Sequence, residues 1–259
     1  MLKAQTLSDW VCLLFDDAST DQSAAILTSY IASDRRFTVF STPYNFSVGP
    51  GIARNFLLER VSTSYVAFCD IDDLWHPEKL DAQLSFHKAN NLDISVTSYA
   101  RFSLPRSIPH IHRLITPPST LNYSRLLRAN TIPMLTVIST LSFVEQRFPP
   151  IRHEDYAFWL SVFKRKSVQY GCLTEVLSFY RIHDANLTKN RLVIPSWIYQ
   201  VYRSLGYHPL RSACLLMLWM IARILIEPYQ LTLSLFCRSQ VRKSRQVLNQ
   251  LLRQPALLS

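Results

Sequence analysis

The feature that most constrains the fold of this chain is the alternation of short apolar runs with longer segments of helical spacing in its first hundred residues. The runs are six to eight residues long, and two of them end in aspartate. They are followed by segments whose apolar residues recur at helical intervals. The predicted strands are WVCLLFDD (10–17), RFTVFS (36–41), SYVAFCD (64–70) and LDISVTSY (92–99). This alternation predicts an α/β fold with a mostly parallel sheet flanked by helices.

The rest of the chain is less regular. We predict an irregular loop over 102–118, which contains His110 and His112, and helices over 120–130 and 151–166. The segments 131–139 and 167–183 are expected to be extended, the latter as one or two short strands.

A hydrophobic content of 48% and a charged content of 18% indicate a chain that forms a core. Five scattered cysteines without C-x-x-C spacing predict neither a disulfide framework nor a zinc site, and favour the cytosol.

Two acidic clusters follow predicted strands. Asp16 and Asp17 end one, and Asp70, Asp72 and Asp73 end another. Ligands of parallel α/β sheets bind at the carboxyl ends of the strands, so both clusters should lie on one rim. Crowded carboxylates repel each other unless a cation neutralises them, and Mg²⁺ or Mn²⁺ would also take diphosphate oxygens. The alternative is that Asp73 caps the helix beginning near Pro77 while the other acids are solvated.

Four segments of residues 5–188 together carry a family resemblance. They are LLFDDASTDQS, GIARN, FCDIDDLWHPEKL and HEDYAFWL. In order and approximate spacing they resemble family 2 glycosyltransferases with the GT-A fold, of the bacterial type that builds surface polysaccharides such as O-antigen, capsule or exopolysaccharide. The resemblance implies an inverting transfer of a sugar from a nucleoside-diphosphate sugar to a hydroxyl of a lipid-linked or other saccharide acceptor.

The resemblance also implies roles for the aspartates. Asp17, with Asp16 beside it, matches the acid that holds the base or ribose of the nucleotide. Asp70 and Asp72, with Asp73 adjacent, match the D-x-D element that binds ribose and the metal, Mg²⁺ or Mn²⁺.

Four further residues receive roles in the same way. Arg54 and Asn55 match a segment that lines the nucleotide site. Asp155 matches the catalytic base, and its own chemistry alone would also fit a carboxylate that favours the start of a helix. His183 resembles a histidine that approaches the diphosphate.

The resemblance divides the chain into a donor-binding half (1–101), an acceptor-binding and catalytic half (102–195) and a basic helical tail (196–259). It also predicts that the usual first strand and helix are lacking, because QTLSDW matches the end of that helix. Ala18 and Phe56 stand where the family commonly has glycine. We therefore expect weak or no activity from the chain as given, which keeps open a non-catalytic GT-A remnant that binds partners in an assembly complex.

The basic tail bears on partners and location. The net charge is +10, and +7 of it comes from residues 196–259, which hold eight basic residues and one acidic residue. A basic tail rich in apolar residues favours an anionic membrane surface over nucleic acid. The apolar run 213–226 is too short to span a bilayer, so we expect it to lie on the cytosolic face of the plasma membrane. The alternative is a helix packed on the catalytic domain or on a partner chain.

One other class of protein shares the paired acids at the first strand end. A phospho-acceptor receiver domain also needs a lone acceptor aspartate about 45 residues later and a lysine after a later strand. Asp70 lies 54 residues after Asp16 in a triple cluster, and no such lysine follows.

No motif identifies the sugar, the base or the acceptor, and residues 102–150 are expected to select them.

Overall fold

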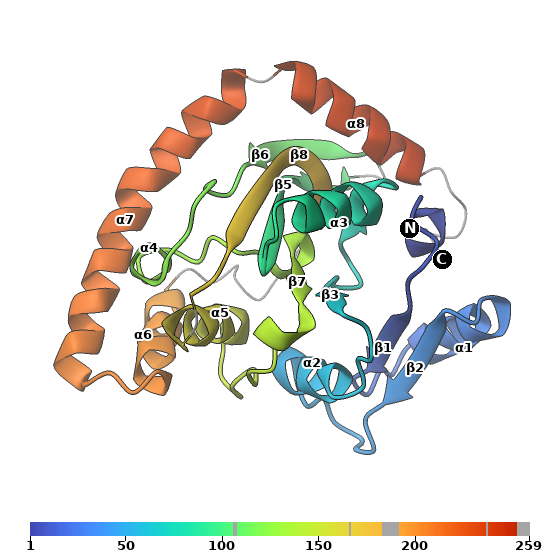
Figure 1. The fold of residues 1–259 in the computed structure, drawn as a ribbon, viewed down its shortest axis with the longest axis horizontal. Helices are drawn as coiled ribbons and strands as arrows, with labels where there is room; N and C mark the ends of the chain where they lie inside the picture. The colour runs from blue at the N-terminus through green and yellow to red at the C-terminus, as the bar shows by residue number, and fades with distance from the viewer. Residues whose placement is uncertain (106–107, 166, 183–191, 237, 253–259) are drawn as a thin grey trace.

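The structure is a computed structural model that describes residues 1–105, 108–165, 167–182, 192–236 and 238–252. Helices and strands interleave along the chain (Figure 1). In the first half these are η1 (Leu2–Ala4), β1 (Cys12–Asp16), α1 (Ser23–Ser33), β2 (Phe37–Ser41), α2 (Pro50–Leu58), β3 (Tyr65–Ala67), β4 (Leu74–Trp75), α3 (Lys79–Ala89) and β5 (Ile94–Ser103). The second half holds β6 (His110–Ile115), α4 (Tyr123–Leu126), η3 (Met134–Thr136), β7 (Ile138–Thr140), η4 (Leu141–Phe143), α5 (Glu154–Arg165), β8 (Tyr170–Arg181), α6 (Ile194–Ser204), α7 (Pro209–Phe236) and α8 (Arg238–Leu252).

The strands form two sheets, and their pairing corrects one expectation. β1 and β2 pair in parallel as a two-stranded sheet. The other six strands form a second sheet in the order β3-β7-β5-β8-β4, with β6 also paired to β5. Among the described pairs of this sheet, β5 and β8 run in parallel and the others are antiparallel. The α/β class is confirmed, but the sheet is mixed rather than mostly parallel, because β6 and β7 enter it without a crossover helix.

The second half differs locally from the sequence prediction. The expected loop at 102–118 contains β6, which pairs antiparallel with β5 and buries Ile111. The helix predicted over 120–130 is limited to α4, whose first turn is capped by Asn122 through the Arg125 N–H. β8 is one strand of 12 residues with irregular pairing to β5, and it replaces the expected short strands.

The main core lies around α5. Tyr156, Phe158, Trp159 and Leu160 of this helix are fully buried, and residues of β5, α6 and α7 pack in the same cluster. A helix that is apolar on most sides must be covered on most sides. The acidic first turn of α5 is the part that stays at the surface of this cluster, which directs Glu154 and Asp155 away from the core.

The face of α3 that meets the sheet is polar. Lys79, Gln83 and His87, spaced four residues apart, are each at most 1% exposed. Lys79 Nζ donates a hydrogen bond to Gln83 Oε1 at 2.7 Å and lies 4.2 Å from the centre of the Trp75 ring. Gln83 Nε2 donates to the Ser95 carbonyl of β5 at 3.0 Å. Burial of this lysine lowers its pKa to about 7.

Two segments frame the fold. The N-terminal residues pack their apolar side chains near Trp75, and Gln5 Oε1 accepts a hydrogen bond from the Leu80 N–H in the first turn of α3. The long helix α7 runs along the opposite side of the molecule and leads to α8 (Figure 1). Within the described part of the chain, no helix combines the length and the apolar character needed to cross a bilayer.

Candidate active site

The first element of the site is the carboxylate of Asp17, just after β1. It accepts hydrogen bonds from Ser47 Oγ at 2.5 Å, Val48 N at 2.7 Å and Gly49 N at 2.9 Å. Partial burial opposes ionisation, but these three donors lower the pKa of Asp17 below its usual value. Asp17 therefore remains ionised and fixes the loop that enters α2.

The turn after β1 is held in a conformation that favours glycine. Asp16 Oδ1 accepts a hydrogen bond from the Ser19 N–H at 3.1 Å. Between them Ala18 has a φ of 63°, in the left-handed region. The family that the sequence resembles commonly has glycine at this position, and here the turn is kept at a steric cost to the alanine Cβ.

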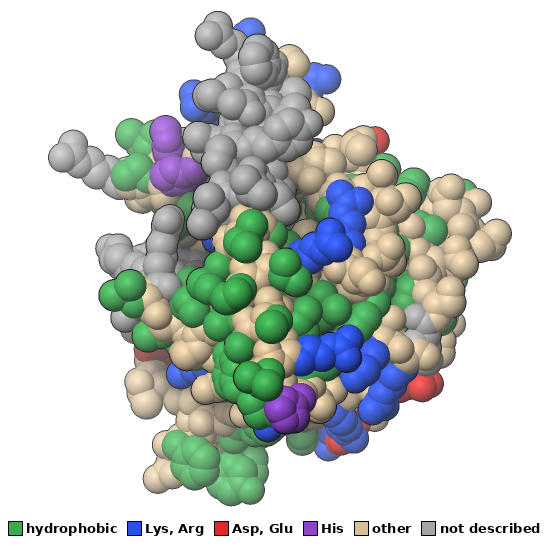
Figure 2. Space-filling model, turned by 90° about the vertical axis from the view of Figure 1, so that its left-hand side faces the viewer, with side chains coloured by type: hydrophobic (Ala, Val, Ile, Leu, Met, Phe, Trp, Pro, Cys, Tyr) green, Lys and Arg blue, Asp and Glu red, His purple; other side chains and the backbone are tan. Residues whose placement is uncertain are grey.

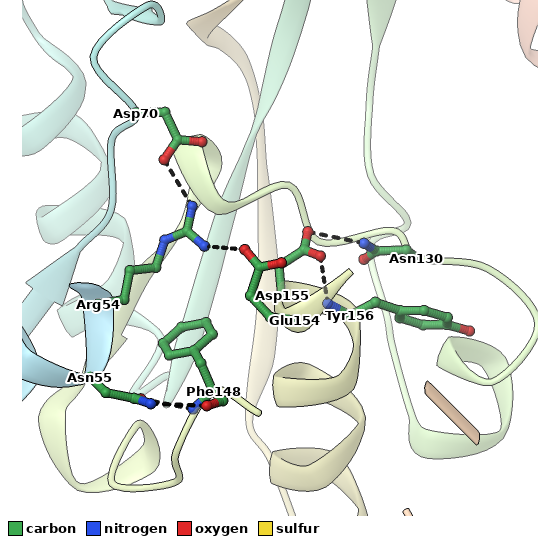
Figure 3. Close-up of polar contacts among 8 residues, drawn as sticks. All are labelled: Arg54, Asn55, Asp70, Asn130, Phe148, Glu154, Asp155 and Tyr156. Carbon is green, nitrogen blue, oxygen red and sulfur yellow. Dashed lines mark hydrogen bonds and ion pairs between the residues drawn. The ribbon is translucent and has the colours of Figure 1, made fainter. Parts of the chain in front are cut away.

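Arg54, on α2, joins the acidic turn to the start of α5 (Figure 3). One guanidinium nitrogen contacts Asp70 Oδ1 at 2.9 Å, and the other contacts Glu154 Oε1 at 2.7 Å. The arginine side chain is 14% exposed. Burial alone would lower the pKa of Arg54, but the two carboxylates raise it, so the guanidinium remains protonated. Arg54 thus brings two segments that are 84 positions apart in sequence into one site.

The acidic turn after β3 contains one exposed and one buried carboxylate. Asp70 is half exposed, and its carbonyl accepts a hydrogen bond from the Asp73 N–H at 3.1 Å. Asp73 is 2% exposed, and its carboxylate accepts from the Arg181 N–H of β8 at 3.0 Å. Burial raises the pKa of Asp73 to about 8, and the neighbouring Asp70 and Asp72 add to the rise. Asp73 therefore bonds to β8 rather than capping α3.

Asp155 lies in the first turn of α5, beside Glu154 (Figure 3). Its Oδ1 accepts from the Tyr156 N–H at 2.7 Å, and its Oδ2 accepts from Asn130 Nδ2 at 3.2 Å. His153, the residue before α5, has a φ of 56°, which turns the chain sharply into the helix. These contacts fix the orientation of a partly exposed carboxylate at a helix N-terminus, where the dipole favours its charge.

α2 approaches the start of α5 closely. A Cβ built on Gly51 would lie 3.1 Å from Glu154 Cγ and 3.4 Å from Phe148 Cβ. Asn55, one turn on, uses its amide twice: Nδ2 donates to the Phe148 carbonyl at 2.9 Å and Oδ1 accepts from the Phe148 N–H at 2.8 Å (Figure 3). Asn55 thus clamps the segment before α5 onto α2.

The carboxylates after β3 fit a hard divalent cation by their chemistry. Asp70 and Asp72 offer oxygen ligands, which Mg²⁺ and Mn²⁺ prefer. In the described ranges no three side chains of His, Cys, Asp or Glu converge as a ready-made metal cage. Ligands from outside the protein, such as phosphate oxygens and water, would have to complete the coordination. His183 lies outside the described residues.

Sequence reasoning missed two residues of this site. Glu154 directly precedes Asp155 in the sequence, but its role depends on the contact with Arg54, and only the fold places these two residues opposite each other. Asn130 ended a predicted helix and gave no signal, because its contact with Asp155 depends on the path of the loop after α4.

Comparison with known proteins identifies the family. The sequence profile described as "Glycosyl transferase family 2" matches residues 1–166, more than half of the chain. The chain belongs to glycosyltransferase family 2. An uncharacterized glycosyltransferase of Haemophilus influenzae is 34% identical over 193 residues, which cover 73% of this chain and 74% of that protein.

Two further relatives link this glycosyltransferase to surface polysaccharides. The putative teichuronic acid biosynthesis glycosyltransferase TuaG of Bacillus subtilis is 32% identical over 203 residues, covering 78% of this chain and 79% of the relative. WfgD of Escherichia coli, named as a UDP-Glc:alpha-D-GlcNAc-diphosphoundecaprenol beta-1,3-glucosyltransferase, is 28% identical over 188 residues, covering 72% and 71%. The expected assignment to a surface-polysaccharide type of this family is confirmed.

Solved structures confirm the GT-A fold. TarS 1-349 of S. aureus in complex with UDP-GlcNAc superposes with a TM-score of 0.65 at 20% identity, covering 86% of this chain and 66% of that chain. The mannosyltransferase PcManGT of Pyrobaculum calidifontis, in complex with GDP-Man and Mn2+, gives a TM-score of 0.59 at 12% identity, covering 98% and 75%.

Proposed function

We propose that this glycosyltransferase moves a sugar from a nucleoside-diphosphate sugar to a hydroxyl group of a growing, lipid-linked surface polysaccharide, with inversion at the anomeric carbon. The observation that carries the proposal is the Arg54 junction, in which one guanidinium contacts both Asp70 and Glu154. The D-x-D turn and the proposed base therefore border one site, as donor and acceptor must for transfer in a single step.

Asp155 is the proposed general base. Its carboxylate takes the proton of the acceptor hydroxyl while the acceptor oxygen forms a bond to the anomeric carbon. The bond between that carbon and the diphosphate oxygen breaks, and the nucleoside diphosphate leaves. Attack on the face opposite the leaving group inverts the carbon. Asn130 donates a hydrogen bond to one carboxylate oxygen of Asp155, and the Tyr156 N–H donates to the other. These two contacts support the proposed role because they fix the orientation of the carboxylate.

The donor is held by the two acidic segments in this proposal. Asp16 and Asp17 bind the base or ribose, with Asn55 lining the site. Asp70 and Asp72 would hold Mg²⁺ or Mn²⁺, which would supply Lewis-acid stabilisation of the charge on the leaving diphosphate. The Mn2+ named with PcManGT supports this choice of cofactor. Asp73 acts indirectly, because its carboxylate is buried against β8.

The acceptor assignment draws on the relatives. WfgD is named for an undecaprenol-linked diphosphate acceptor and TuaG for teichuronic acid. We propose an acceptor of the same lipid-linked class, handled by residues 102–195 next to the donor-binding half (1–101). Such an acceptor resides in the membrane, which supports placing the enzyme at the cytosolic face of the inner membrane through residues 196–259.

A non-catalytic remnant is the second candidate. It is favoured by the separation of the sheets, since among the described strands β1 pairs only with β2, and β3 only with β7. Such a protein would bind a donor or a partner enzyme without turnover.

Donor binding followed by transfer tests both candidates. Calorimetry with a panel of sugar nucleotides, with and without Mn²⁺, identifies the donor, and transfer is then measured to a synthetic lipid-diphosphate sugar. We expect Asp155→Asn to bind the donor normally and to lose about 10²-fold or more in transfer. Asp72→Asn should lose the gain in affinity from Mn²⁺.

The control variant is Asp81→Asn, an exposed acid on α3 that should leave both readouts unchanged. Transfer by Asp155→Asn at the wild-type rate would refute the assignment of the base. Donor binding without any transfer by the wild-type chain would favour the non-catalytic candidate.

A further inference from the structure

The helix α7 exposes an apolar stripe along its outer face. Leu210, Met217, Leu218 and Ile221 are 73%, 57%, 51% and 52% exposed. Together with the exposed Ala213 and Cys214 they recur at i, i+3, i+4, i+7, i+8 and i+11, so they share one face of the helix. Figure 2 shows these green side chains gathered along α7, in view from outside.

The inner face of the same helix is already occupied. Trp219 is 8% exposed and belongs to the main core, with Leu215 and Leu216 packed against it. The inner face therefore anchors α7 on α6 and on the core. The outer stripe is a separate surface, and it does not result from a helix that is detached from the fold.

A cluster of cations borders the stripe at the start of α7. Arg203 donates a hydrogen bond to the Tyr207 carbonyl. Lys164 Nζ lies 5.1 Å from the centre of the Tyr207 ring, and the Arg211 guanidinium carbon lies 4.6 Å from it. Arg223, four residues after Trp219, lies over that ring on the core-facing side of α7. Residues 196–259 hold eight basic residues and one acidic residue, so the tail carries a net positive charge.

We infer that the outer face of α7 docks on an anionic lipid bilayer, with the stripe (Leu210, Ala213, Cys214, Met217, Leu218 and Ile221) at the acyl boundary and the flanking cations at the headgroups. Apolar side chains between basic residues are the composition of a helix that lies in a membrane interface. The choice of a bilayer also rests on the proposed function, because a lipid-linked acceptor is confined to it.

A second copy of the chain fits this face less well. A second copy brings the same excess of positive charge to the contact, because residues 196–259 hold eight basic residues and one acidic residue, and like charges oppose such a contact. Anionic headgroups complement the cations at the start of α7.

Vesicle co-sedimentation tests the docking. The full chain is mixed with vesicles of phosphatidylcholine alone or with phosphatidylglycerol, at low and high salt. We expect binding to the anionic vesicles, weakened by salt because exposed charges are screened. The variant Met217→Gln/Leu218→Gln should lose about tenfold or more in bound fraction, because two apolar side chains no longer favour the interface.

The control Val11→Gln/Ile108→Gln changes two apolar residues of similar exposure outside α7, and should bind vesicles like the wild type. Wild-type binding by the Met217/Leu218 variant would overturn the inference. So would a dimer of the wild type in light scattering that this variant dissociates, since a second copy would then cover the stripe. Donor binding, measured by calorimetry on the same preparations, separates the two proposals. If the wild type binds no donor, the proposed function is contradicted. If the wild type binds donor but not vesicles, only the docking of α7 is contradicted.

Discussion

At the residue scale, one arginine organises the site. The fork of Arg54 contacts carboxylates from two distant segments, at 2.9 Å and 2.7 Å, while it is almost fully removed from solvent. A planar guanidinium presents donors in two directions at once, which an ammonium on a flexible stem does not. The distance between the D-x-D turn and the first turn of α5 therefore depends on the identity of this side chain.

We predict that Arg54→Lys lowers transfer by at least about tenfold, because a lysine holds one carboxylate and leaves the other displaced. Steady-state kinetics should show the loss mainly in kcat, since the proposed base moves relative to the donor. Arg36→Lys is the matched control, since Arg36 pairs with Asp34 at 2.8 Å at a more exposed position. Equal kinetics for both variants would contradict the role of Arg54.

A second residue-scale prediction concerns Ala18, whose φ of 63° costs an alanine about 1 kcal/mol relative to glycine. Ala18→Gly should therefore raise the free energy of unfolding by roughly 0.5–1 kcal/mol in a denaturant titration. Ala53→Gly, in the interior of α2, should lower it by about 1 kcal/mol. A loss of stability in both variants would show that the turn carries no strain.

At the element scale, α2 is the hub of the site. The loop before it is held by Asp17, its middle carries Arg54, and Asn55 clamps the segment before α5. Gly51 permits the close contact with Glu154. The two acidic clusters are therefore connected through α2. They do not share the expected rim of one sheet, because β1 and β3 belong to different sheets.

Gly51→Ala tests this packing. The added methyl favours the helix by about 1 kcal/mol, but its Cβ lies only 3.1 Å from Glu154 Cγ, so Glu154 must shift. We expect transfer to fall by about tenfold with little change in thermal stability. The neighbouring variant Ile52→Ala, at a 45% exposed position, should retain its transfer rate. Full activity of Gly51→Ala would mean that α5 tolerates displacement.

The polar face of α3 gives a pH prediction. Burial lowers the pKa of Lys79 to about 7 in the folded chain, whereas the unfolded chain retains the ordinary value. From pH 7 upward to the ordinary lysine pKa, the unfolded chain binds more protons, so this group makes the folded chain more stable as pH rises. Below pH 7 both states are charged and the effect is constant.

Lys79→Met removes this titration. Between pH 7 and pH 9 the wild type should gain on the order of 2 kcal/mol in unfolding free energy relative to this variant, at about 1.4 kcal/mol per unit of pKa shift. Lys88→Met, exposed on the same helix, should keep the wild-type slope. Parallel pH curves for wild type and Lys79→Met would show that Lys79 stays charged in the fold.

At the scale of the whole molecule, the described chain has two sheets that differ in how many partners their strands have and in how deeply they are buried. β5 is paired on both sides, and its Ile94 and Val96 are fully buried. Among the described strands β1 pairs with β2 alone, and each of its residues is only partly buried. Local opening costs less where fewer apolar groups are covered.

We therefore predict that the amides of β1 and β2 exchange hydrogen faster than those of β5 and β8. Hydrogen exchange followed by mass spectrometry on peptides covering these strands measures the difference. Added donor with Mn²⁺ should slow exchange in β1 if Asp16 and Asp17 bind the nucleotide. Equal protection of the two sheets without ligand would contradict the prediction.

Local sequence patterns predicted the positions of several helices and strands. The positions of β1, α1, β2, α2 and α3 follow from apolar periodicity and from Gly and Pro signals, because such signals act within a few residues. Strand β6 escaped prediction because the proline-containing stretch around it is typical of a loop, and only its pairing with β5 makes it a strand.

By itself, the sequence determined the α/β class, the family and the residues available for chemistry, because these depend on local order and on motifs that the chain carries in series. The tertiary structure alone decided the antiparallel pairing, the bridging of Asp70 and Glu154 by Arg54, the burial of Asp73 and the exposure of the α7 stripe. Each of these depends on contacts between segments far apart in the chain, whose free energies arise only when packing brings them together.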